Sequence, residues 1–294
     1  MFFCARSPFS LVRPLQFYLV TLTVVCGCAL VPSLLFAQET ASHPIRGLPF
    51  NRLYSIDEIG KVSRGARLSF DPFGRLAVID KSGYFVLNDT AWIDLTERES
   101  EGESMLNVVQ DSTGHSYYGA LGSWGQVEYT SNGMLKRHSL VPTNAPPWAK
   151  DTNFTDIIPT KDGVYFGGFY GIVFWNSSSH QTIFFEASSV TQILSLGNRV
   201  FACTRTHSLE FVDTISHTVR PVEINLPPNT VLEQWVPLDD EHALVSTNDN
   251  RLFIFDGKQV TPWWNQLGSQ LPGRITTMQR LPDGSVAVAV TGYG

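Results

Sequence analysis

Cysteine is scarce in this sequence, and its placement excludes a framework of disulfide bonds. Cys4, Cys26 and Cys28 lie within the first 37 residues, which leaves Cys203 as the fourth and last cysteine. A chain that loses this segment on export keeps neither an intrachain disulfide nor a cysteine metal cluster. Its stability must therefore come from packing.

Charge is scarce too, at 16% of the residues, and no cluster of Lys and Arg occurs. Loss of the first 37 residues would change the net charge from −6 to −8, because that segment carries two arginines and no acid. We expect such an acidic domain to bind neither nucleic acid nor an anionic membrane surface.

Motifs for catalysis and metal binding are also missing. The Gly-x-Ser-x-Gly motif is nearest at LGSWG, residues 121–125, which lacks the first glycine. The seven histidines show no paired zinc-ligand spacing. We therefore predict no catalytic residue, no metal ligand and no cofactor.

The first 37 residues differ from the rest of the chain. Arg6 and Arg13 precede a run without charge that extends from residue 14 to residue 38. This pattern is typical of a secretory signal peptide, with cleavage after Ala37, and predicts a periplasmic or extracellular location. One alternative is an uncleaved membrane anchor, since the apolar run approaches the ~20 residues that span a bilayer. Lipidation at Cys28 is another.

Short apolar runs bounded by Gly and Asp fill the remaining chain. Residues 153–175, NFTDIIPTKDGVYFGGFYGIVFW, predict an antiparallel meander. Comparable first turns lie near Gly74, Gly114, Gly163, Gly197, Glu241 and Gly284, at intervals of 40, 49, 34, 44 and 43 residues. A period near 42 residues is typical of a four-stranded propeller blade.

The sequence therefore predicts an all-β fold, a β-propeller of four-stranded blades with five complete repeats and half of a sixth in an incomplete or open ring. Residues 1–37 form the signal peptide or anchor, and residues 38–65 an extended lead-in with a short helix at 56–60. The repeats occupy 66–294, with units at 66–103, 104–151, 152–187, 188–229 and 230–273 and a partial unit at 274–294. A β-sandwich or jelly roll would not produce this recurring pattern.

Two kinds of turn residue are expected in each unit. Asp71, Asp111, Asp162 and Asp283 are predicted to accept hydrogen bonds from nearby backbone N–H groups. The second turn is predicted to hold a residue with positive φ, which glycine adopts without strain and Asn and His adopt more readily than most. These second-turn residues are Gly83, Gly125, Gly171, His207 and Asn250.

The repeats resemble those of a known family. The segments DSTGHSYYGALGSWGQVEY (111–129), TKDGVYFGGFYGIVFW (160–175) and LPDGSVAVAVTGYG (281–294) follow a Gly-x-Pro-x-x-x-x-Tyr lead-in at residues 47–54. They look like two-component regulator propeller repeats, the extracytoplasmic sensor region of bacterial histidine kinases and one-chain hybrid regulators. The resemblance implies a signal-sensing role for residues 66–294. It also implies that any kinase activity would lie in a missing C-terminal region.

A ligand-binding face follows from strand direction. Strands alternate in direction, so the turns between the second and third strands and the segments between blades should share one face. The candidate ligand-binding residues on that face are Trp124, Trp148, Phe169, Tyr170, Arg205, His207, Asn248, Asp249, Trp263 and Trp264. Such side chains suit stacking on sugar rings or capture of a peptide. The alternative is that Trp92, Trp175, Trp235 and some of the rim tryptophans pack between sheets.

The leading hypothesis is a non-enzymatic, exported sensor that binds a carbohydrate or another small molecule, with a homodimer formed through the propeller as a further interaction. Membrane contact would come only through an uncleaved N-terminal segment or a missing C-terminal span. The second hypothesis is an exported propeller enzyme, such as a polysaccharide lyase or a lactonase. The innermost strands supply few of the charged residues that an enzyme needs. A scaffold for protein partners is the third.

Overall fold

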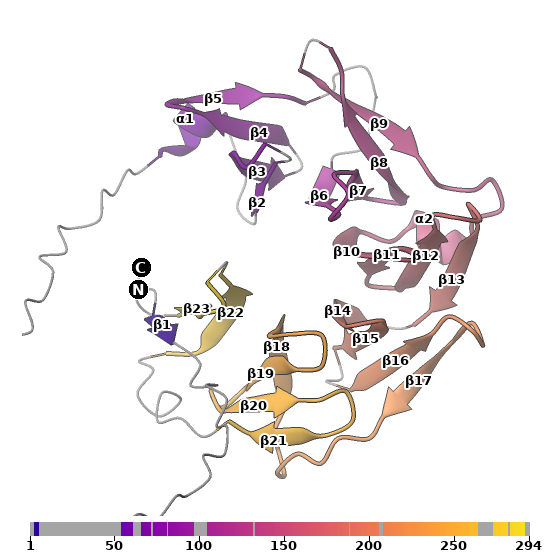
Figure 1. Cartoon of the computed structure of the whole chain (residues 1–294), viewed down its shortest axis with the longest axis vertical. Coiled ribbons are helices and arrows are strands. Elements are labelled where there is room, and N and C mark those ends of the chain that lie inside the picture. The colour runs from indigo at the N-terminus through magenta and orange to yellow at the C-terminus, as the bar shows by residue number, and fades with distance from the viewer. Residues whose placement is uncertain are drawn as a thin grey trace, which may run out of the picture. The chain divides into compact units, whose positions relative to one another are not determined.

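A computed structural model describes residues 3–5, 54–60, 66–71, 73–80, 82–96, 105–131, 133–187, 189–205, 208–263, 273–281 and 283–291. The chain divides into two units. One consists of Met1–Ser7 and Ser55–Gly294 and holds every described strand, and the other is Pro8–Tyr54. Figure 1 shows the strands of the larger unit as small sheets that follow one another along the chain.

Five of the sheets are four-stranded antiparallel meanders, numbered here in chain order. The first sheet comprises β2 (Arg67–Phe70), β3 (Leu76–Asp80), β4 (Gly83–Asn88) and β5 (Ala91–Asp94). The second comprises β6 (Met105–Gln110), β7 (Ser116–Ala120), β8 (Ser123–Tyr129) and β9 (Leu135–Ser139). The third comprises β10 (Phe154–Thr160), β11 (Gly163–Gly168), β12 (Gly171–Asn176) and β13 (Thr182–Glu186).

The fourth sheet comprises β14 (Val190–Leu196), β15 (Arg199–Thr204), β16 (Leu209–Asp213) and β17 (Thr218–Val222). The fifth comprises β18 (Leu232–Pro237), β19 (Ala243–Thr247), β20 (Leu252–Phe255) and β21 (Val260–Pro262). The sixth sheet pairs β22 (Ile275–Arg280) with β23 (Val286–Val290), and β1 (Phe3–Ala5) lies antiparallel to β23. The prediction of an all-β propeller with five complete repeats and half of a sixth is confirmed.

Two short helices accompany the sheets. The helix α1 (Ile56–Ile59) lies where the lead-in was predicted to be helical, and α2 (Pro147–Lys150) precedes the third sheet. In the described part of the chain, neither helix has the length and apolar character needed to cross a membrane.

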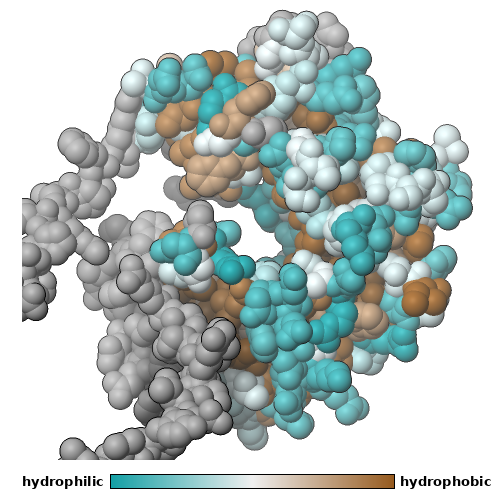
Figure 2. Space-filling view, in the orientation of Figure 1, coloured by the Kyte–Doolittle hydropathy of each residue, from teal (hydrophilic) through white to brown (hydrophobic). Residues whose placement is uncertain are grey.

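Both faces of an inner sheet are buried, because successive residues of a strand point to opposite sides. On β7, Tyr118 packs in the cluster shared with the first sheet, whereas Tyr117 packs in the cluster shared with the third. On β11, Val164 and Tyr165 divide in the same way between the second and fourth sheets. Apolar clusters thus lie between consecutive sheets, and Figure 2 shows hydrophobic atoms between them.

Close packing of the sheets requires glycine on some second strands. A Cβ at Gly119 on β7 would meet the carbonyl oxygen of Phe154 on the innermost strand of the next sheet. A Cβ at Gly167 on β11 would come within 2.9 Å of the Ile193 side chain on β14. The absence of a side chain therefore lets the next innermost strand approach.

The turns largely match expectation. Asp71, Asp111 and Asp283 accept backbone N–H groups two residues ahead, at 3.0, 2.9 and 3.0 Å. Asp162 instead offers its main-chain carbonyl to the N–H of Ser177, at 3.2 Å. Asn250 has the predicted positive φ, at 61°.

One predicted second-turn position is wrong. Gly125 lies inside β8, and the positive φ of that turn, 64°, belongs to Gly122. The β-strand begins at Ser123, two residues before the glycine that was expected to form the turn. His207 lies outside the described residues.

Candidate functional site

A β-bulge recurs near the start of the innermost strands. In each of five innermost strands, the pairing with the second strand skips one residue. The strands are β6, β10, β14, β18 and β22, and the skipped residues are Leu106, Thr155, Thr191, Glu233 and Thr276. The residue after the skipped one is polar in every case: Asn107, Asp156, Gln192, Gln234 and Thr277. Bulges re-aim side chains, so these strands present polar groups at equivalent positions.

Arg67 holds the corresponding position on the first sheet. It lies four residues before Asp71, as Asn107 lies four residues before Asp111 in the equivalent turn. The Arg67 Nη1 atom is 3.6 Å from Asp156 Oδ1 on the third sheet. This ion pair therefore connects two sheets that are not neighbours in the chain.

Several of the equivalent polar residues also bond to the next innermost strand. Asn107 Nδ2 donates to the Thr155 carbonyl at 2.8 Å, and Gln192 Nε2 donates to the Trp235 carbonyl at 3.2 Å. Asp156 Oδ2 accepts the Ile193 N–H at 3.1 Å. The second, third, fourth and fifth sheets are thus joined through these side chains.

Asp156 is the most enclosed charged group of this set. Its side chain is 17% exposed, whereas that of Arg67 is 44% exposed. Burial raises the pKa of the Asp156 carboxyl, and the Arg67 charge and the Ile193 N–H offset only part of that effect. A carboxyl with a raised pKa that faces a cavity can bind a polar ligand or take part in proton transfer.

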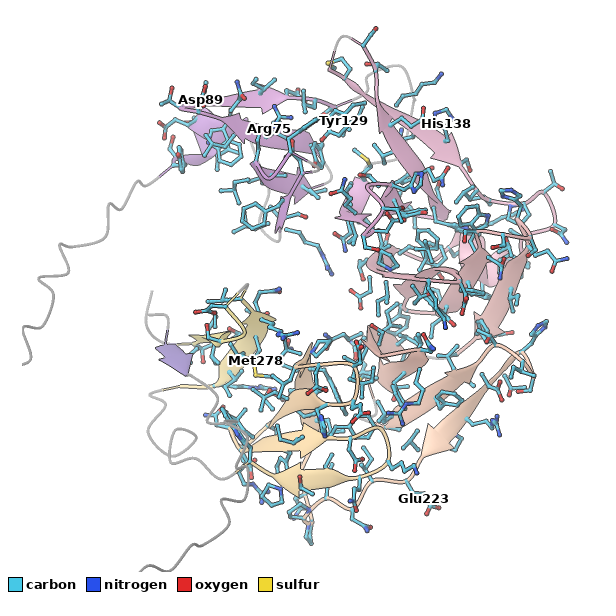
Figure 3. All side chains as sticks on the ribbon, in the orientation of Figure 1. Arg75, Asp89, Tyr129, His138, Glu223 and Met278 are labelled. Carbon is cyan, nitrogen blue, oxygen red and sulfur yellow. The ribbon has the colours of Figure 1, made fainter. Side chains whose placement is uncertain are left out.

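A cavity of about 730 Å³ lies among these innermost strands, and we call it the central cavity. Met278, labelled in Figure 3, is one of its lining residues on β22. Its wall is formed by Arg67, Asp156, Thr191, Gln192, Glu233, Gln234, Trp235, Val236, Pro237, Thr277, Met278, Gln279 and Arg280. The wall thus holds two arginines, two acids and three glutamines, which supply both donors and acceptors of hydrogen bonds.

The charges of the cavity differ in how they are paired. Glu233, with a side chain 9% exposed, binds Arg274 through two hydrogen bonds. The Arg280 guanidinium has no partner among the described residues and is exposed. No group of three or more His, Cys, Asp or Glu that could hold a metal occurs in the chain as described. The amides and charged groups of the wall can form hydrogen bonds with a polar molecule.

The sequence carries a repeated signal for these equivalent polar positions, although they form no catalytic motif. The innermost strands begin with MLNV, FTDI, VTQI, LEQW and ITTM, in which an apolar residue is followed two positions later by a polar one and then by another apolar residue. The recurring third residue marks the position after the bulge.

The second turns lie beside the segments between blades, as strand direction predicts. Second turns bond directly to the segments between blades: the Gly122 N–H donates to the Thr152 carbonyl at 2.8 Å, and the Asn248 N–H donates to the Val231 carbonyl at 2.9 Å. The Val190 N–H donates to the Phe169 carbonyl at 3.1 Å. The turns and interblade segments therefore lie side by side.

Three of the predicted site residues come together on this face. Phe169 and Tyr170 form the turn between β11 and β12, and their ring centroids are 5.1 Å apart in an edge-to-face arrangement. Arg205, which follows β15, places its guanidinium carbon 5.7 Å from the centre of the Phe169 ring. We call Phe169, Tyr170 and Arg205 the rim cluster.

The prediction that Trp124 lies on the rim is wrong. Its side chain is fully buried, with ring centroids 5.0 Å from Phe154 and 6.1 Å from Phe184. Because β8 begins at Ser123, Trp124 belongs to a strand that faces the third sheet. Trp175 and Trp235 are buried between sheets, as the alternative interpretation predicted.

The other predicted site residues mainly stabilise local structure. Trp148 in α2 is half-buried against Phe184, and Trp263 packs against the cluster between the fifth and sixth sheets. Asn248 Oδ1 accepts the Val231 N–H at 3.0 Å, and Asp249 pairs with Arg251 at 2.7 Å. His207 and Trp264 lie outside the described residues.

No protein-family model and no curated protein matches the sequence. The structure resembles the extracellular domain of a putative hybrid two component system from B. thetaiotaomicron, with a TM-score of 0.59 and 13% identity over 81% of this chain and 34% of that one. A second such domain from B. thetaiotaomicron has a TM-score of 0.53 and 12% identity over 77% of this chain and 31% of that one. This chain thus spans about a third of the length of either domain.

The fold is also similar to that of virginiamycin B lyase from Staphylococcus aureus. The TM-score is 0.52, with 11% identity over 72% of each chain. Extracellular domains of hybrid two component systems and a lyase therefore share this fold with the chain, and at such identities the likeness concerns the fold alone.

Proposed function

We propose that this chain is an exported, ligand-sensing β-propeller that acts as the N-terminal sensor part of a two-component-type regulator. The observation that carries the proposal is the central cavity, whose volume of about 730 Å³ falls in the range of small-molecule sites. The extracellular domains with a similar fold support the exported location and the sensing role.

The wall of the cavity favours a polar ligand such as a carbohydrate. Gln192 and Gln234 come from different sheets and carry amide groups that both donate and accept hydrogen bonds, as sugar hydroxyls require. Arg280 adds a guanidinium whose donors are not used by the described residues. Recognition would thus depend mainly on hydrogen bonds.

Signalling would follow from the way the cavity is built. Its lining residues come from the first, third, fourth, fifth and sixth sheets, so one ligand could contact several sheets at once. A ligand that prefers one spacing of these sheets would shift the population toward that spacing. A homodimer formed through the propeller would transmit such a change. Light scattering with and without ligand tests whether this homodimer forms.

The test is calorimetric titration of the full chain with a panel of neutral and acidic oligosaccharides. Arg280→Gln and Gln234→Ala should weaken binding of a panel member by about tenfold, the effect of losing one hydrogen bond to a charged or polar ligand. Arg137→Gln is the control, since Arg137 lies over the Tyr118 ring on the second sheet and does not line the cavity. Absence of binding across the panel would reject the proposal.

A second candidate function is a lyase. Asp156 favours it, because a carboxyl with a raised pKa in a cavity is suited to general acid-base catalysis, and the fold is shared with virginiamycin B lyase. Release of unsaturated products from a polysaccharide, lost in Asp156→Asn, would support the lyase and reject the sensor as the main function.

A further inference from the structure

We infer that the rim cluster is a subsite for a carboxylate group, and that the ligand is a small acid with a flat apolar face, such as a uronic acid sugar or an aromatic acid. The inference rests on the proposed function, since it describes how one end of a ligand in the central cavity would be held. It is carried by the contacts of Phe169, Tyr170 and Arg205.

The aromatic part of the cluster is open to solvent. Phe169 is 37% exposed and Tyr170 is 46% exposed, although large aromatic side chains are usually buried. Both lie in a two-residue turn whose ends are fixed by the pairing of Gly168 with Gly171. The rings are therefore presented by a rigid hairpin and can receive the flat face of a ligand.

Guanidinium groups lie over aromatic rings at four other places in the described chain, and two of these show what the rim cluster lacks. Arg75 lies 5.2 Å from the centre of the Phe73 ring and pairs with Asp71 at 2.7 Å. Arg251 lies 5.8 Å from the Phe253 ring and pairs with Asp249 at 2.7 Å. In both, a guanidinium on an aromatic ring also binds a carboxylate.

The rim cluster contains the ring and the guanidinium but no acid. Among the described residues, no carboxylate or other acceptor bonds to the Arg205 side chain, which is exposed over Phe169. A carboxylate from a ligand would complete the arrangement seen at Arg75 and Arg251, through the paired N–H donors that arginine offers to a planar acid.

The cluster is linked to the central cavity through β14. The main-chain N–H of Arg205 donates to the Ser189 carbonyl at 2.6 Å, and the main-chain N–H of Val190 donates to the Phe169 carbonyl at 3.1 Å. Thr191 and Gln192, the next two residues, line the cavity. Two residues of a strand span about 7 Å, so a ligand of two or three sugar rings reaches from Arg205 into the cavity.

The test compares an acidic ligand with its neutral counterpart. The full chain is titrated with a galacturonic acid trimer, a galactose trimer and benzoate, at two salt concentrations. We expect the acidic trimer to bind about tenfold more tightly than the neutral trimer, consistent with a charge-assisted bond to Arg205. Arg205→Gln should remove this preference, and Arg205→Lys should restore only part of it, because a lysine keeps the charge but not the paired donors.

Arg137→Gln removes one positive charge from an arginine over a buried ring and should leave the preference unchanged. Thermal unfolding of each variant checks that it is folded. Equal binding of the two trimers, or a preference that survives in Arg205→Gln, would overturn the subsite while leaving the proposed function intact. Benzoate binding that depends on Arg205, without binding of either trimer, would support the subsite and reject a carbohydrate sensor. No binding of any probe would overturn both.

Discussion

Arg67 and Asp156 form an ion pair in the wall of the central cavity, with 3.6 Å between Nη1 and Oδ1. The pair joins the first sheet to the third, while Asn107 of the intervening sheet bonds to the carbonyl of Thr155, beside Asp156. Asp156 also accepts the Ile193 N–H from the fourth sheet. One partly buried carboxyl therefore takes part in the contacts between several blades and lines the cavity of the proposed ligand.

The titration of Asp156 should make stability depend on pH. Burial raises its pKa above the ordinary value of 3.8, to which it returns in the unfolded chain. Between pH 3.8 and the raised pKa of the folded state, the folded protein holds a proton on Asp156 that the unfolded chain releases. The contribution of Asp156 to stability therefore falls as pH rises through this range. Asp156→Asn removes this dependence.

Urea denaturation of Asp156→Asn and the unmodified chain at several pH values measures the effect. The free energy of unfolding of the variant, minus that of the unmodified chain, should increase as pH rises above 3.8. Arg67→Gln serves as the matched variant, because loss of the positive charge should raise the pKa of Asp156 further and extend the window. A difference that stays constant with pH would contradict this account.

Asp71→Ala should destabilise the first sheet more than the same change in an equivalent turn. The fully buried Asp71 carboxylate binds Arg75 through Nε and Nη2, both at 2.7 Å. Its removal leaves a guanidinium that is only 27% exposed without its acid, at an expected cost of roughly 3 kcal/mol.

Asp111→Ala is the control, since that carboxylate accepts the N–H groups of Thr113 and His115 but binds no arginine among the described residues. Its expected cost is about 1 kcal/mol. Chemical denaturation measures the free energy of unfolding of both variants. Equal losses would show that the pairing of Asp71 with Arg75 adds no stability.

Local patterns explain which parts of this structure were predictable. The Asp turns and the short strands depend on neighbouring residues, so the blade repeat was evident from the sequence. The burial of Trp124 was not evident from the sequence, because the turn lies at Gly122 and not at Gly125. A small displacement of a strand boundary decides whether a side chain lies in a turn or on a buried face.

The candidate site was harder to predict than the fold for a different reason. The central cavity gathers side chains such as Arg67, Asp156 and Arg280 from strands that are far apart in the sequence. Each strand contributes only one to three polar residues, so no local motif forms. The rim cluster was predicted in part, because Phe169, Tyr170 and Arg205 lie in turns whose face follows from strand direction.

Gly119→Ala tests how tightly the second and third sheets pack. The added methyl group would meet the Phe154 carbonyl oxygen, which belongs to the backbone and cannot rotate away. We expect a loss of roughly 2–3 kcal/mol in the free energy of unfolding. At Gly133, φ is 80° and no atom of the described residues beyond its chain neighbours lies within 4 Å of an added Cβ. The same substitution should there cost about 1 kcal/mol, from the backbone conformation alone. A smaller loss at Gly119 than at Gly133 would contradict the close packing.

Substitution of Trp124 separates a core role from a role in ligand binding. Its side chain is fully buried against Phe154 and Phe184, so Trp124→Ala should cost roughly 3–5 kcal/mol. The indole Nε1 has no hydrogen-bond partner within the described structure, and Trp124→Phe removes this buried N–H while keeping an aromatic ring. Removal of the unpaired N–H stabilises the folded state and offsets the packing lost with the smaller ring. The free energy of unfolding of Trp124→Phe should therefore stay within about 1 kcal/mol of that of the unmodified chain. Because Trp124 faces the third sheet and not the rim, Trp124→Phe should also leave ligand affinity unchanged in calorimetric titration. A folded Trp124→Phe protein with weakened binding would instead return this residue to the ligand site.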